Sequence, residues 1–234
     1  MTANPHTIAQ RLDAVCARIR TAEEEYARVP GSVTLVAVSK TQPPQTIIAA
    51  YNAGQRHFGE SYLNEALPKM AMLAGRDIEW HYVGAIQSNK TADIAAHFAW
   101  VHSVDRLKIA ERLHHQRPAS MPPLNVCIQV NVSGEIQKAG VAPDALDELV
   151  AAVAQLPRLR LRGLMTLPAP AADFTAQRRP LRALRLAYER LRTAGYDLDT
   201  LSMGMSDDLE AAIAEGATLV RVGTDIFGAR PRKA

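Results

Sequence analysis

Two short segments near the carboxyl end of the sequence combine glycine with a hydroxyl side chain. Gly204 precedes Ser206 by two residues, and Gly223 directly precedes Thr224. Glycine lets the backbone approach a ligand closely, and the amides and hydroxyls of such turns can bind an anion. Ser206 is also a favourable N-cap for the helical pattern that follows it. We therefore expect Ser206, Gly223 and Thr224 to hold a phosphate group, with plain helix capping as the alternative.

Three acidic residues accompany these turns. Asp207 and Asp208 follow Ser206, and Asp225 follows Thr224. Carboxylates that faced a phosphate would repel it. We expect all three side chains to point away from the anion.

Lys40 is the candidate nucleophile. It follows the apolar run Val33–Val38 and precedes Pro43-Pro44, which predicts a lysine at the end of a buried strand. Apolar walls and nearby cations favour the neutral amine, which can condense with an aldehyde. The alternative is a lysine whose amine extends into solvent. The two phosphate-binding turns favour the first interpretation.

Arg221 lies inside a second apolar run, Leu219–Val222. A permanent charge that faces a buried site needs a specific partner. One candidate is the pyridine nitrogen of a cofactor, whose protonation the arginine would disfavour, so that the ring would be a weaker electron sink. The other is a carboxylate such as Glu60. The sequence leaves both partners open.

Short apolar runs alternate with longer helical patterns along the chain. Eight predicted strands cover 33–38, 56–58, 79–83, 100–104, 124–130, 159–165, 200–203 and 218–222. Predicted helices cover 44–53, 63–73, 91–98, 107–115, 145–156, 175–194 and 209–215, and Ile8, Leu12, Val15, Cys16 and Ile19 indicate a further helix before the first strand.

This alternation predicts an α/β protein with buried parallel strands, and eight units fit a closed (β/α)8 TIM barrel. We expect one domain over 1–234, with the N-terminal helix within about 1–30 and a flexible tail at about 231–234. An open sheet with an edge strand is the alternative, because 56–58 and 200–203 are short. In a barrel, the ends of the strands that carry Lys40 and the two turns meet at one mouth, where ligands bind.

The composition narrows the functional classes. With 47% hydrophobic and 22% charged residues, the sequence is typical of a globular protein. A net charge of +3 does not favour nucleic acid as a partner. No apolar run suggests a secretion signal or a membrane span, so we expect a cytoplasmic protein that does not bind membranes. Two cysteines cannot assemble a disulfide framework or a metal cluster, and no metal site is predicted.

The sequence resembles the pyridoxal 5′-phosphate (PLP) homeostasis protein family, also called the YggS/PROSC or PLP-binding-protein family, over nearly its whole length. The resemblance rests on Lys40 in Val38-Ser39-Lys40-Thr41, on Arg221, on the two glycine turns, and on further segments: Phe58-Gly59-Glu60, Trp80-His81 with Gly84, Gln87-Ser88-Asn89-Lys90, Val130-Asn131-Val132, Gly163-Leu164-Met165-Thr166 and Met203-Gly204-Met205-Ser206. Each motif is weak alone, and together they are specific.

The resemblance implies a barrel similar to the N-terminal domain of alanine racemase, with PLP held as a Schiff base on Lys40. It also implies that Ser206, Gly223 and Thr224 bind the phosphate and that Arg221 faces the pyridine nitrogen. The resemblance further implies that the protein buffers or delivers PLP, as members of that family do. We therefore expect apo forms of PLP-dependent enzymes to be the partners that receive PLP. The sequence departs from the family at Ser61, where the family usually has asparagine. Any contact that the asparagine side-chain amide makes near the pyridine ring is therefore in doubt here.

The alternative function is a PLP-dependent amino-acid racemase or a related enzyme. A racemase needs a second acid/base, and we expect no counterpart of the additional domain that is involved in supplying it in alanine racemase. His81 could act as a base from the mouth of the barrel, or could pack inside it. A PLP-free phosphosugar barrel is a third possibility, disfavoured by the lack of an acid/base cluster. We expect a non-enzymatic carrier and a monomer, and the sequence leaves open whether Lys90 or Lys138 offers PLP a second site.

Overall fold

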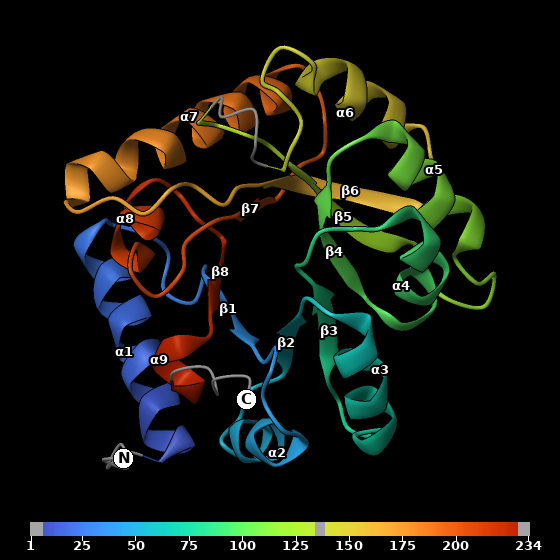
Figure 1. Cartoon of the computed structure of the whole chain (residues 1–234). Coiled ribbons are helices and arrows are strands. Elements are labelled where there is room, and N and C mark those ends of the chain that lie inside the picture. Colours follow the sequence, from blue (N-terminus) through green and yellow to red (C-terminus); the bar gives the residue numbers. More distant parts are fainter. Residues whose placement is uncertain (1–6, 134–138, 229–234) are drawn as a thin grey trace.

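The computed structural model of the chain describes residues 7–133 and 139–228. Eight parallel strands pair in chain order, and β1 pairs with both β2 and β8, so the sheet closes into a barrel. Helices surround the strands on the outside (Figure 1). The predicted (β/α)8 barrel is confirmed, and the alternative of an open sheet is wrong.

The observed elements follow the predicted order. The strands are β1 Thr34–Val38, β2 His57–Glu60, β3 Glu79–Tyr82, β4 Trp100–Val104, β5 Leu124–Gln129, β6 Leu159–Met165, β7 Thr200–Ser202 and β8 Leu219–Val222. The helices are α1 Ile8–Glu25, α2 Pro44–Asn52, α3 Leu63–Met72, the 3-10 turn η1 Ser88–Lys90, α4 Thr91–His97, α5 Leu107–Gln116, α6 Leu146–Ala154, α7 Phe174–Thr193, α8 Leu209–Ala214 and α9 Thr224–Phe227. No described helix has both the length and the apolar character needed to cross a membrane.

The core has two parts, because successive strand residues face opposite sides of the sheet. Val220 and Val222 belong to the large apolar core between the strands and the helices. A separate small cluster consists of Trp100, Cys127 and Met165. Several of the remaining side chains on that inner side are polar, and they form the interior of the barrel described below.

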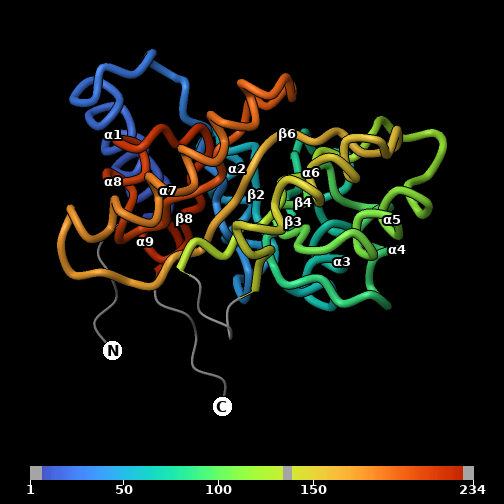
Figure 2. The backbone as a smooth tube through the Cα atoms, turned by 90° about the horizontal axis from the view of Figure 1, so that it is seen from above, coloured from blue at the N-terminus to red at the C-terminus, as the bar shows by residue number. Residues whose placement is uncertain are grey.

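The N-terminal helix α1 lies on the outside of the barrel next to the last two helices. Thr7 caps it, since its side chain accepts a hydrogen bond from the Gln10 amide. Its buried face, which includes Leu12 and Val15, packs against α8 and α9. Figures 1 and 2 both show these three helices side by side. The predicted tail at 231–234 lies outside the described residues.

Gly163 marks the closest approach of two strands. It pairs with Thr200 in β7, and a Cβ built on it would lie 1.8 Å from the carbonyl oxygen of Thr200. Strand β6 also changes its register against β5 at this point. A side chain here would push β6 and β7 apart.

We expect Gly163→Ala to lower the free energy of unfolding by about 3 kcal/mol, the upper range for overpacking. Gly75→Ala is the matched control: its φ of +82° disfavours alanine, but no atom lies within 4 Å of the built Cβ, so its cost is about 1 kcal/mol. Urea unfolding of both variants measures the difference. Equal losses would contradict the steric argument.

Candidate functional site

The turn after β1 presents Lys40 and has a strained backbone. The Gln42 amide donates to the Ser39 carbonyl over 3.1 Å, and Thr41 has a φ of +64°. That conformation is costly for a β-branched residue. It is held in part by Glu65 of α3, whose Oε2 accepts a hydrogen bond of 2.8 Å from the Thr41 amide. Because such a conformation persists only where surrounding contacts hold it, the turn beside Lys40 has a defined conformation.

A buried ion pair also holds this turn. Lys69 donates to Oε1 of Glu60 over 2.8 Å and to the Ser39 carbonyl over 2.9 Å, and the Ser39 hydroxyl donates to the same Glu60 oxygen over 2.7 Å. Burial raises the pKa of Glu60, while Lys69 lowers it. Sequence reasoning missed Lys69. Its signal was available, because Lys69 lies on the apolar stripe of α3 with Leu63 and Ala66, where a lysine needs a partner.

The five residues predicted to bind a cofactor line a single cavity of about 210 Å³ at the carboxyl ends of the strands. They are Lys40, Ser206, Arg221, Gly223 and Thr224. The other lining residues are Val38, Gln42, Val83, Leu167, Met205, Asp207 and Gly228. Three segments that are far apart in the sequence therefore meet at one mouth, at the place where a TIM barrel binds ligands.

The glycine turns pack closely against their neighbours, and Gly204 is also required by its backbone conformation. Gly204 has a φ of +97°, and a Cβ on it would lie 2.6 Å from the Ala212 side chain. A Cβ on Gly223 would lie 3.1 Å from the Val38 carbonyl oxygen, so this turn packs directly against the end of β1. Thr224 begins α9, and the first amides of a helix have no partners within it. The turn therefore offers amides and a hydroxyl close to Lys40.

Ser206 does not cap the helix as expected. It lies in a turn, and Asp208 occupies the N-cap position of α8. The Asp208 carboxylate accepts a hydrogen bond of 2.7 Å from the Met205 amide and closes the turn in this way. The Ser206 hydroxyl is therefore not needed for capping, and Ser206 lines the cavity.

Arg18 of α1 connects both glycine turns. It donates to the Ser206 carbonyl over 3.0 Å, to Asp225 over 2.6 Å, and to both carboxylate oxygens of Glu210. This contact also turns Asp225 away from the cavity, as expected, whereas Asp207 is among the lining residues. Sequence reasoning missed Arg18, because an arginine on an amphipathic helix carries no local signal of a distant partner.

Arg221 is buried inside the barrel, with 4% of its surface exposed. It donates to the Ser202 hydroxyl over 2.6 Å and to the Thr166 carbonyl over 2.9 Å. The proposed pairing with Glu60 is wrong, since Glu60 binds Lys69. Burial lowers the pKa of Arg221 to about 10, although Asp208 acts in the opposite direction. The guanidinium therefore stays charged at neutral pH, and its face toward the cavity is a positive, hydrogen-bond-donating wall.

His81 is not at the mouth. It is buried in the middle of the barrel between His57 and His102, and burial lowers the pKa of its imidazole well below the usual value. It is absent from the lining of the Lys40 cavity. The prediction of His81 as a possible base at the mouth is therefore not supported, and the packed interpretation is the correct one.

A second cavity of about 630 Å³ adjoins the first, and Lys40 contributes to both. Lys90 and Ser61 line this second cavity. The Ser61 backbone packs tightly, since a Cβ on Gly84 would lie 2.3 Å from its carbonyl oxygen. Ser61, where the resemblance implies an asparagine, therefore lines the same cavity as Lys40. Lys138 lies outside the described residues.

Known proteins resemble the chain over nearly its whole length. A family model described as the alanine racemase N-terminal domain matches residues 11–231. The pyridoxal phosphate homeostasis protein of Pseudomonas aeruginosa is 59% identical over 224 residues, which are 96% of this chain and 96% of that protein. Its counterpart in Escherichia coli strain K12 is 51% identical over 226 residues, 95% of this chain and 97% of that protein.

The chain is also similar to proteins of known structure. PipY of Synechococcus elongatus PCC7942, in a structure with PLP bound, has a TM-score of 0.84 at 36% identity and covers 95% of this chain and 100% of its own. Alanine racemase of Corynebacterium glutamicum shares the fold, with a TM-score of 0.70 at 19% identity over 93% of this chain and 62% of its own. The chain belongs to the pyridoxal phosphate homeostasis protein family.

Proposed function

We propose that this protein binds PLP in the cavity that Lys40 lines and acts as an intracellular reservoir that buffers or delivers it. The observation that carries this proposal is the convergence of Lys40, Arg221 and the two glycine turns on one cavity. The names of the relatives and the PLP-bound structure of PipY support the same ligand.

Each group of the cavity fits one part of PLP. The Lys40 amine attaches the cofactor through its aldehyde carbon. Ser206, Gly223 and Thr224 accommodate the phosphate with hydroxyls and amides, and Arg18 holds the two turns at the right separation. Bound PLP supplies an electron-withdrawing ring and a reactive aldehyde carbon. Whether bound PLP takes part in catalysis depends on the acid/base groups around it.

Arg221 favours a carrier over a racemase. A guanidinium that retains its proton would donate a hydrogen bond to the pyridine nitrogen of bound PLP without protonating it, so the ring would withdraw electrons less strongly than a protonated one. Among the residues described as lining the cavity, none is a histidine or tyrosine, and Asp207 is the carboxylate that accompanies Lys40. This set lacks a matched pair of acid/base groups on opposite faces of a ligand.

The role of Lys40 is tested by its substitution. We expect purified protein incubated with PLP to show the visible absorption band of a lysine-bound cofactor at about 420 nm. The Lys40→Ala variant should lack this band. Lys90→Ala, in the neighbouring cavity, is the matched control and should keep the band. A Lys40→Ala protein that retains the band after gel filtration would show that another residue carries the cofactor.

The role of Arg18 is tested by Arg18→Gln. Loosening both glycine turns should weaken PLP binding about tenfold, equivalent to about 1.4 kcal/mol, and should leave the affinity for pyridoxal, which has no phosphate, nearly unchanged. Titration with both ligands gives the ratio of the two affinities. Arg190→Gln removes an exposed ion pair with Asp147 and serves as the control. An equal loss of affinity for PLP and for pyridoxal would show that Arg18 stabilises the protein in general and not the phosphate site in particular.

Carrier and enzyme are separated by two assays on the PLP-loaded protein. We expect it to transfer PLP to an apo-enzyme faster than an equal concentration of free PLP does. We also expect racemisation of single L-amino acids no faster than with free PLP, because neither histidine nor tyrosine is among the residues described as lining the cavity of about 210 Å³. Turnover well above the free cofactor would replace the carrier by the racemase alternative.

A further inference from the structure

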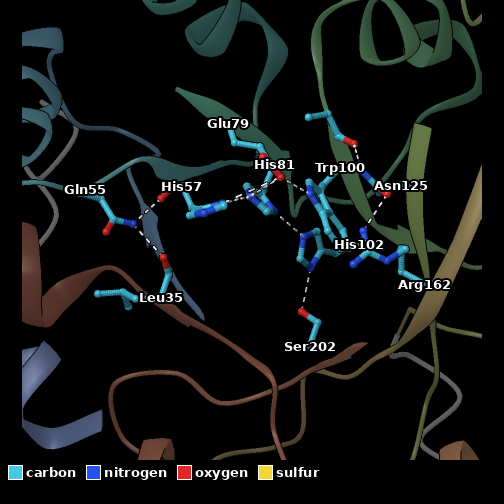
Figure 3. Close-up of polar contacts among 11 residues, drawn as sticks. Leu35, Gln55, His57, Glu79, His81, Trp100, His102, Asn125, Arg162 and Ser202 are labelled. Carbon is cyan, nitrogen blue, oxygen red and sulfur yellow. Dashed lines mark hydrogen bonds and ion pairs between the residues drawn. The ribbon is translucent and has the colours of Figure 1, made fainter. Parts of the chain in front are cut away.

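Three side chains that could bind a metal meet at the opposite end of the barrel from Lys40. His57 and Glu79 are the first residues of β2 and β3, and His81 follows two residues later on the inner side of β3. Parallel strands begin at one end of the barrel and finish at the other, so this cluster is separate from the cofactor cavity. Figure 3 shows the three side chains pointing toward one another.

The distances between the possible ligand atoms suit a small cation. Nδ1 of His57 lies 3.1 Å from Nε2 of His81, and Oε1 of Glu79 lies 3.9 Å from the first nitrogen and 4.0 Å from the second. Ligands at zinc bond lengths in a tetrahedral arrangement lie about 3.4 Å apart. Shifts of less than about 1 Å would therefore bring all three atoms to one ion.

The groups behind the cluster orient it. The indole nitrogen of Trp100 donates a hydrogen bond to Oε1 of Glu79, and the Trp100 ring stacks on His81 with centroids 5.5 Å apart. Nδ1 of His81 lies 2.9 Å from Nε2 of His102, so a proton on Nδ1 leaves Nε2 of His81 available as a ligand. A histidine that binds a metal typically donates its other ring N–H to an acceptor, and Nε2 of His102 is placed to be that acceptor.

Solvent reaches the cluster through a cavity of about 220 Å³, which the three residues line together with Trp100, Arg162 and Asp199 among others. The side chains of His57 and Glu79 are 34% and 41% exposed, whereas His81 is buried. There is space for a water molecule as the fourth ligand. Arg162, the nearby cation, forms a two-oxygen ion pair with Asp199 and stacks on Trp100.

We propose that His57, Glu79 and His81 form a binding site for one divalent transition-metal ion of the zinc class, with water as the fourth ligand. Two imidazoles and one carboxylate favour zinc and its neighbours over magnesium or calcium, which prefer oxygen ligands. The site lies outside the mouth where TIM barrels perform catalysis, so its role is structural or regulatory. It is independent of the proposed PLP function.

The experiment uses full-length, tag-free, PLP-loaded protein that has been stripped with a chelator and then dialysed against micromolar zinc chloride. We expect one equivalent of retained zinc and no retained magnesium in a parallel dialysis. Zinc should also raise the thermal unfolding midpoint, since an ion that binds only the folded state stabilises it. Protein that retains no zinc and shows no shift would overturn the proposal.

Variants locate the ion. His57→Gln and Glu79→Gln alter partly exposed residues and should weaken zinc binding at least about 100-fold, and Trp100→Phe, which removes the donor to Glu79, about tenfold. The control His97→Gln/His115→Gln removes two exposed histidines outside the cluster and should retain one equivalent. If zinc binding and the thermal shift persist in Glu79→Gln, or vanish in the control, the ion lies elsewhere and the site is refuted.

Discussion

The pairing of β1 with β8 is the interaction on which the ligand cavity depends. Leu35 pairs with Val220, and Ala37 pairs with Val222, so the first and last strands finish side by side. The turn that carries Lys40 then meets the turn that carries Gly223, and a Cβ on Gly223 would make a tight contact of 3.1 Å with the Val38 carbonyl oxygen. In an open sheet these two turns would lie at opposite edges, and no cavity would form between them.

The fold was predictable because buried parallel strands leave a strong pattern of apolar runs that alternate with amphipathic helices. Even the weak segment at 56–58 was found, although β2 extends to Glu60. The five predicted ligand residues lie together because strand ends converge in a barrel. The long-range contacts of Arg18 and Lys69 were not predicted, since each depends on which helix packs beside which strand end.

For two of the alternatives that the sequence left open, the sequence already contained the reason that they are wrong. Side chains alternate along a strand, and Glu60 lies on the same side of β2 as Phe58, which belongs to the core beneath the helices. Arg221 lies between Val220 and Val222 and therefore faces the other side, the barrel interior. The two residues could not meet. His81 similarly lies within β3 and not at its end, so it contributes to the interior and not to the mouth.

The interior itself is polar, and Arg221 is its charged group beside the ligand cavity. Arg221, Ser202, His102 and His81 are linked by successive hydrogen-bond contacts of 2.6, 2.7 and 2.9 Å. Burial, together with Arg221, lowers the pKa of His102 to about 3, so this imidazole is neutral at physiological pH. Buried polar groups need hydrogen-bond partners. Here the imidazoles of His81 and His102 are hydrogen-bond partners of each other, and His102 also contacts the Ser202 hydroxyl. The Arg221 guanidinium is thereby held next to the ligand cavity.

The contacts of Arg18 have a consequence for the time at which the cavity can exist. This arginine is separated by 188 residues from Ser206 and by 207 from Asp225, the partners that it holds in the two glycine turns. A ribosome makes Arg18 and Lys40 early and the turns last. A nascent chain therefore contains the nucleophilic amine of Lys40 long before it contains the residues of the phosphate site. The complete cavity can form only after residue 225 has been synthesised and α1 has packed against α9.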